Sequence, residues 1–143
     1  MHTATIPQVI ARMCNEPRFT GLGGPGTLPG MVREAEGCEI LHSVFVARGY
    51  QIRRDVAFHE LGVAFNADGW DPAARVGFEY LTSEADDRKD LTADEMAELA
   101  ARMERGELFL LIVDEREVDA PETLRFAAEK FLDEVERRRG GRP

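Results

Sequence analysis

The stretch NADGWDPAARVGFEYLT, residues 66–82, decides the fold that this sequence predicts. Residues 68–72 are rich in Asp, Gly and Pro, which favour tight turns. Residues 75–82 have the two-residue period of a strand, with Val76, Phe78 and Tyr80 on one face. The other face would carry Arg75, Gly77, Glu79 and Leu81. The stretch therefore predicts the end of one strand, a polar turn at 68–72 and a second strand.

Upstream of this stretch, the sequence predicts a helix followed by strands. Residues 31–48 carry apolar side chains at steps of three and four, the period of one helix face. This apolar stripe consists of Met31, Ala35, Cys38, Leu41 and Phe45. Gly49 stands where a helix C-terminus favours a residue that tolerates the left-handed conformation. The period then changes to two, so residues 52–59 and 61–65 are expected to form one or two strands.

Downstream, a helix, a buried strand and a last helix are expected. Residues 83–91 are highly charged and are expected to form a surface loop. Thr92 and Glu95 have the spacing of a capping box, which marks the start of a helix. Residues 108–113, LFLLIV, form a continuous apolar run that suits a strand buried on both faces. Asp119 is expected to cap the last helix. The apolar stripe of that helix is Leu124, Ala128, Phe131, Leu132 and Val135.

These segments predict an α/β (α+β) protein with a mixed sheet of about four strands flanked by helices, in the order α-β-β-β-α-β-α. The 143 residues suit a single domain. Within it, residues 1–30 are expected to be a flexible N-terminal segment, and residues 31–139 a compact core. The N-terminal segment contains the Gly- and Pro-rich stretch Gly21–Gly30, which is expected to be a loop.

The charge of the chain bears on its partners. The formal net charge is −9. Residues 83–143 carry 18 acidic and 11 basic residues, so most of the negative charge lies in that half. An acidic surface repels phosphate backbones, so binding to nucleic acid is not expected. A protein partner, basic in character, is the expectation instead.

The N-terminus and the cysteines set the expected compartment. The chain begins without the basic start and long apolar segment of a secretory signal, and no window is apolar enough to span a bilayer. A cytoplasmic location without membrane contact is therefore the default expectation. Cys14 and Cys38 have no metal-ligand spacing and are expected to be reduced, partly buried small side chains.

Three carboxylates, Asp68, Asp71 and Glu79, lie close together in the sequence around the predicted turn. Ions such as Mg²⁺ are held by one or two carboxylates plus water, and they assist phosphodiester hydrolysis by activating water and neutralising charge. An Asp at a strand end and a Glu on the next strand are suited to share one ion. The alternative is structural: the aspartates hydrogen-bond their own turn, and Glu79 occupies an ordinary strand position.

The element order, together with Asp68-Gly-Trp and Phe-Glu79-Tyr, resembles the core of the PD-(D/E)XK nuclease superfamily. The resemblance covers residues 31–113 in topology, but only these two tripeptides in residues. It implies a restriction-endonuclease-like fold, with Asp68 and Glu79 as Mg²⁺ ligands, and cleavage of DNA or RNA.

The chain departs from the family where the family has its Lys, two residues after the Glu. Leu81 stands there, and a Leu can neither orient the attacking water nor stabilise developing negative charge. A base from elsewhere, such as Arg54, Arg75 or Lys130, would have to replace it.

Three hypotheses follow from these patterns. The one we favour is a small non-catalytic binding or accessory protein that acts through protein–protein contacts and needs no cofactor. The alternative is a divergent nuclease of the PD-(D/E)XK type that depends on Mg²⁺ at Asp68 and Glu79. A third is a small-ligand binder that uses the Gly21–Gly30 loop as a lid over Trp70. The oligomeric state, and the identity of any partner or ligand, stay open at this stage.

Overall fold

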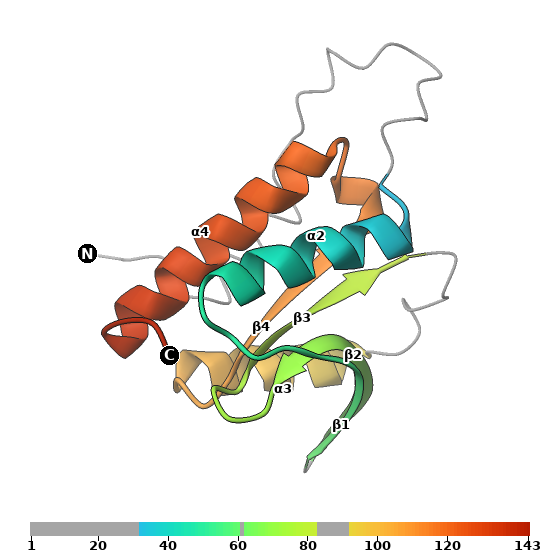
Figure 1. Ribbon diagram of the computed structural model, residues 1–143. Helices are drawn as coiled ribbons and strands as arrows, with labels where there is room; N and C mark the ends of the chain where they lie inside the picture. Colours follow the sequence, from blue (N-terminus) through green and yellow to red (C-terminus); the bar gives the residue numbers. More distant parts are fainter. Residues whose placement is uncertain (1–31, 61, 83–91) are drawn as a thin grey trace, which may run out of the picture.

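The computed structural model describes residues 32–60, 62–82 and 92–143, and within them the chain folds into one sheet with helices on both faces (Figure 1). The elements in chain order are α2 (Glu34–Ala47), β1 (Arg53–Glu60), β2 (Val63–Asp71), β3 (Val76–Leu81), α3 (Ala93–Glu104), β4 (Phe109–Asp114), the 3₁₀ turn η4 (Glu115–Glu117) and α4 (Pro121–Arg139). The predicted α+β class and the predicted order of helices and strands are confirmed.

The four described strands form a mixed sheet in the order β1-β2-β3-β4. β1 with β2 and β2 with β3 are antiparallel, whereas β3 and β4 are parallel. Helix α3 supplies the crossover that a parallel pair requires. The apolar run at 108–113 is confirmed as a buried strand, because β4 lies between the helical layers.

Helices α2 and α4 lie side by side on one face of the sheet, and α3 covers the opposite face (Figure 1). The ring of Phe45 on α2 lies 5.1 Å from that of Phe78 on β3 and 6.2 Å from that of Phe131 on α4. Arg48 joins the two helices at their C-terminal ends, where its guanidinium binds Glu129, Asp133 and Glu136 of α4. The predicted apolar stripe of α4 is buried as expected.

The turn predicted at residues 68–72 is wrong in position. Strand β2 continues through residue 71, because Trp70 pairs with Arg53 on β1 and with Gly77 on β3. The turn begins only at Asp71, whose Oδ1 accepts hydrogen bonds of 3.0 Å from the amides of Ala73 and Ala74. The sheet pairing on both sides outweighs the local turn preference of Asp-Gly.

Two further sequence expectations concern helix starts. The capping box is confirmed: the Thr92 hydroxyl accepts a hydrogen bond from the Glu95 amide, and the Thr92 amide donates one to the Glu95 carboxylate. The cap predicted at Asp119 is wrong: the N-cap is Ala120, and Asp119 accepts instead from the hydroxyl of Thr123. The segment 1–30, with its Gly21–Gly30 loop, and the loop at 83–91 lie outside the described residues.

Glycine at position 37 allows α2 to approach β3. A Cβ at this position would lie 2.5 Å from Cε2 of Tyr80, a distance that real Cβ atoms do not show. The hydroxyl of Tyr80 is held in turn by the carbonyl oxygen of Val32, at 2.6 Å. The ring of Tyr80 therefore lies against the start of α2, with its edge at Gly37 and its hydroxyl bound to Val32.

We predict that Gly37→Ala destabilises the protein, although alanine is the better helix former. Overpacking against Tyr80 should cost about 2–3 kcal/mol, in the upper part of the usual range because the contact is so short, and this exceeds the gain of about 1 kcal/mol in helix propensity. Urea unfolding measures the difference. Ser43→Ala, at an exposed position of the same helix, is the control: it removes only the 2.8 Å hydrogen bond of the hydroxyl to the Ile40 carbonyl and overpacks nothing, so it should change stability less than Gly37→Ala. A Gly37→Ala variant as stable as the wild type would contradict the close packing.

Candidate functional site

The candidate site lies where β2 and β3 separate. Gly69 on β2 and Phe78 on β3 form the last backbone pair between these two strands. One residue further, the Asp68 amide donates to Oε1 of Glu79 at 3.1 Å, and the Tyr80 amide donates to Oδ2 of Asp68 at 2.7 Å. The structure thus brings the two predicted site residues together: the carboxylate of Asp68 accepts from a backbone amide of β3, and the carboxylate of Glu79 accepts from a backbone amide of β2.

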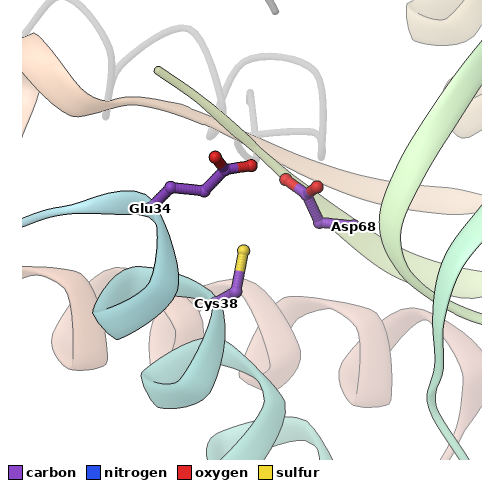
Figure 2. A group of neighbouring side chains, drawn as sticks. All are labelled: Glu34, Cys38 and Asp68. Carbon is purple, nitrogen blue, oxygen red and sulfur yellow. The ribbon is translucent and has the colours of Figure 1, made fainter. Parts of the chain in front are cut away.

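Helix α2 contributes two more side chains to this place. The ligand atoms of Glu34, Cys38 and Asp68 all lie within 4.8 Å of one another, as Figure 2 shows. Glu34 and Cys38 are four residues apart, so they share one face of the helix. Glu79 is not part of this group in the described part of the chain. It is 1% exposed and lies deeper in the sheet.

The site concentrates negative charge. The pKa of the Cys38 thiol is raised far above its ordinary value, first by burial and then by the charges of Asp68 and Glu34. Glu79 and Asp55 add to the same effect. At neutral pH the thiolate fraction of Cys38 is therefore small, which makes it a weak nucleophile. The carboxylates of Glu34 and Asp68 are the groups here that suit a hard divalent cation.

None of the three bases considered as replacements for the family's Lys contacts Asp68 or Glu79 in the described structure. Arg54 pairs with Glu39 at 2.9 Å. Arg75 binds Glu60 through both guanidinium nitrogens, at 2.9 and 3.0 Å. The ammonium of Lys130 on α4 lies 5.7 Å from the ring of Phe126. Leu81 itself packs against the hydrophobic core.

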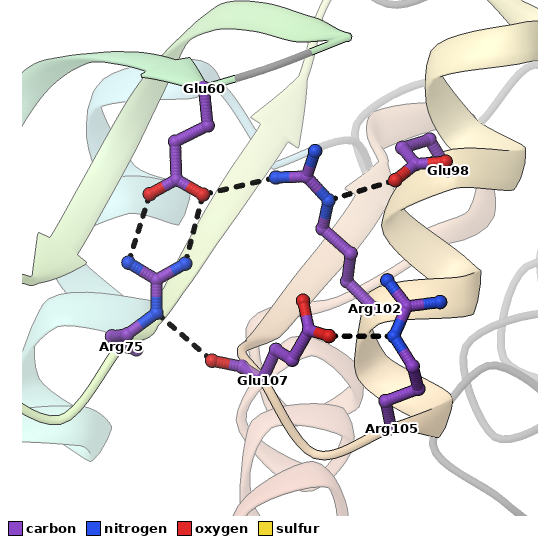
Figure 3. A network of polar contacts seen from close by, with 6 residues as sticks. All are labelled: Glu60, Arg75, Glu98, Arg102, Arg105 and Glu107. Atoms are coloured by element: carbon purple, nitrogen blue, oxygen red, sulfur yellow. Dashed lines mark hydrogen bonds and ion pairs between the residues drawn. The ribbon is translucent and has the colours of Figure 1, made fainter.

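A second polar cluster lies on the α3 side of the sheet (Figure 3). Glu60, near the tip of the β1–β2 hairpin, accepts both from Arg75 and from Arg102 of α3, the latter at 3.0 Å. Arg102 also binds Glu98, and Arg75 donates to the backbone carbonyl of Glu107. Arg75 lowers the pKa of Glu60 through their hydrogen bonds and opposite charges.

Sequence analysis missed Glu34 and the Glu60 cluster. The only local signal for Glu34 is its four-residue spacing from Cys38, and Cys38 was assigned to the apolar stripe of the helix. Glu60 and Arg102 are 42 residues apart in the chain, so no local pattern connects them. Trp70 is 5% exposed and is covered by Phe58.

Comparisons with family models, with characterised proteins and with solved structures gave no match, so the site is interpreted from its own geometry. Among the described residues, the helices are too short or too polar to cross a membrane.

We predict that Cys38 reacts slowly with iodoacetamide at pH 8. A pKa raised by more than one unit leaves less than about one-tenth of the usual thiolate. Cys14→Ser provides a background with one thiol. In that background Asp68→Asn should speed the reaction, because it removes a charge that disfavours the thiolate. Glu39→Gln, which changes an acid that does not act on Cys38, should have no effect. A Cys38 that reacts as fast as glutathione would contradict the electrostatics.

Proposed function

We propose that this chain is a non-catalytic binding protein that acts as an accessory or inhibitory partner of a basic macromolecule. One observation carries the proposal: Asp68 and Glu79 accept backbone amides across the gap between β2 and β3, beside an apolar Leu81. In that arrangement the carboxylates support the sheet.

Surface charge supports a basic partner. Many of the arginines are bound by groups of the chain itself. Those bound to carboxylates include Arg48, Arg54, Arg75, Arg102, Arg105, Arg116, Arg137 and Arg142. Because these positive charges are neutralised within the molecule, the net charge of −9 is carried by the remaining exposed acids. Such a surface steers a basic partner towards itself.

Helix α3 carries more acidic than basic residues. Arg102 on the helix binds Glu98, and Arg105 at its C-cap binds Glu107, so both arginines belong to the second cluster. Asp94 and Glu104 remain exposed on the helix. We place the contact with a basic partner here.

Affinity purification from the native cell tests this proposal with a charge-reversal pair. The double variant Asp94→Lys/Glu104→Lys should fail to recover the partner that the wild type recovers. The control Glu36→Lys/Glu122→Lys makes the same change in charge on the opposite helical layer and should still recover it. A wild-type protein that stays monomeric in light scattering and recovers no specific partner would contradict the proposal, as would equal recovery by both variants.

A second candidate function is a divergent divalent-cation-dependent nuclease. The observation that favours it is the closeness of the carboxylates of Glu34 on α2 and Asp68 on β2, with Glu79 accepting from the Asp68 amide on the neighbouring strand. The mixed sheet with its helical crossover is also the topology that the resemblance implied. In this candidate the carboxylates of Glu34 and Asp68 would hold the ion, which would activate a water for attack on a phosphodiester.

This candidate predicts Mg²⁺ or Mn²⁺ binding that Asp68→Asn and Glu34→Gln each weaken by tenfold or more, while Glu39→Gln leaves it unchanged. Calorimetric titration measures the binding. Cleavage of single- and double-stranded DNA and RNA should require the metal and should be lost in Asp68→Asn and Glu79→Gln. Binding and cleavage that are both absent from the wild type would eliminate the nuclease candidate and leave the binding proposal untouched.

A further inference from the structure

The β1–β2 hairpin is folded back on itself. The ring of Phe58 lies 5.1 Å from the ring of Phe65 and 5.3 Å from that of Trp70. In a straight strand, residues 65 and 70 would be about 16 Å apart and would point to opposite faces. One side chain can contact both only if β2 bends sharply between them.

The bend coincides with a break in the pairing of the two strands. Pairs are formed at Arg54–Gly69 and at Val56–Ala67, but the pair between them, Asp55–Asp68, is missing. Asp55 has a φ of 51°, in the left-handed region that non-glycine residues rarely adopt. Both strands are thus irregular at the same level, and the hairpin bends there.

Beyond this bend the hairpin contributes Phe58, Val63, Phe65 and Ala67 to the buried core, and few printed polar contacts join it to the rest of the described structure. β1 packs closely against β2 and against no other described element to a comparable extent. Near the tip, Glu60 binds Arg75 and Arg102 (Figure 3). The Ala64 amide also donates to Glu95 of α3, at 3.2 Å. The Glu60 ion pairs are partly exposed to solvent, so they are open to screening by salt.

We propose that residues 56–60 and 63–67 form a hinged flap over Trp70, and that Glu60 is the latch that holds it closed. Opening would rotate this flap about Asp55 and Asp68 and uncover Phe58 and Trp70. Arg75 retains the carbonyl of Glu107 when the latch opens, and Arg102 retains Glu98, so both arginines keep a partner in the open form.

The hinge lies in the candidate site. The carboxylate of Asp68 binds the Tyr80 amide and lies beside Glu34 and Cys38. Movement of the flap would therefore shift this carboxylate, so that a partner bound to the flap would alter the acidic group at the start of α2. This coupling rests on the proposed cation site, whereas the flap itself rests on geometry alone.

Amide hydrogen exchange followed by NMR tests the flap without reference to any activity. In the wild type, the amides that join β1 to β2 within the flap should exchange faster than those that join β3 to β4. Glu60→Gln keeps the size of the side chain and removes the charge, and it should accelerate exchange in the flap by about tenfold, the effect of losing one charge-assisted hydrogen bond. The amides of β3 and β4 should keep their rates.

Glu39→Gln is the matched control, since it removes the charge of an exposed ion pair with Arg54, on the body side of the hinge. It should leave exchange in the flap unchanged. Trp70 is the only tryptophan, so acrylamide quenching of its fluorescence should rise in Glu60→Gln and not in the control. Flap amides that exchange as slowly as those of β3 and β4, an equal acceleration of all amides in Glu60→Gln, or no acceleration at all would overturn the proposal.

Discussion

The hydrogen bonds that Asp68 and Glu79 exchange with the neighbouring strand are the interaction on which the shape of this sheet depends. Where β2 turns away from β3, the amides of Asp68 and Tyr80 would otherwise lose their partners. A buried amide without a partner costs about 1–3 kcal/mol, so a sheet cannot open at such a place without substitute acceptors. The two carboxylates supply them. The strands are then free to diverge, the hairpin can fold over Trp70, and α2 can approach through Gly37.

The same geometry explains why the site is ambiguous. Carboxylates from separate strands that meet at the opening of a sheet are suited to hold an ion, and the acids around Cys38 have the charge for one. They are equally suited to the structural role that they already perform. Leu81 packs against the hydrophobic core at the position where the resemblance would place a Lys. The binding role that we propose uses the carboxylates in their structural role, whereas the nuclease candidate requires them to hold an ion.

The parts of the fold that sequence predicted correctly are mostly those set by burial, together with the capping box at Thr92. The apolar run of β4 and the apolar stripe of α4 can be shielded from water only inside the protein, and both are buried where the patterns predicted. The stretch at 68–72 failed because its residues favour a turn locally, while pairing with β1 and β3 favours a strand. Asp119 failed for a related reason, since its carboxylate prefers the Thr123 hydroxyl to the free amides of the helix. At the site, Asp68 and Glu79 were predictable as neighbours on adjacent strands. The group at Glu34 and the cluster at Glu60 depend on how helices pack onto the sheet, and no local spacing encodes that packing.

The most direct test of this account is the free energy of unfolding of Asp68→Ala compared with Asp68→Asn, measured in urea. If Asp68 serves the sheet, Asp68→Ala should lose about 1–3 kcal/mol by leaving the Tyr80 amide without its acceptor. Asp68→Asn should recover most of that loss, because its amide oxygen can still accept the hydrogen bond. If Asp68 instead belongs to a group of acids kept together for function, the negative charges of that group repel one another. Asp68→Ala should then relieve the repulsion and raise the free energy of unfolding. An Asp68→Ala variant as stable as the wild type, or more stable, would contradict the structural role on which the account depends.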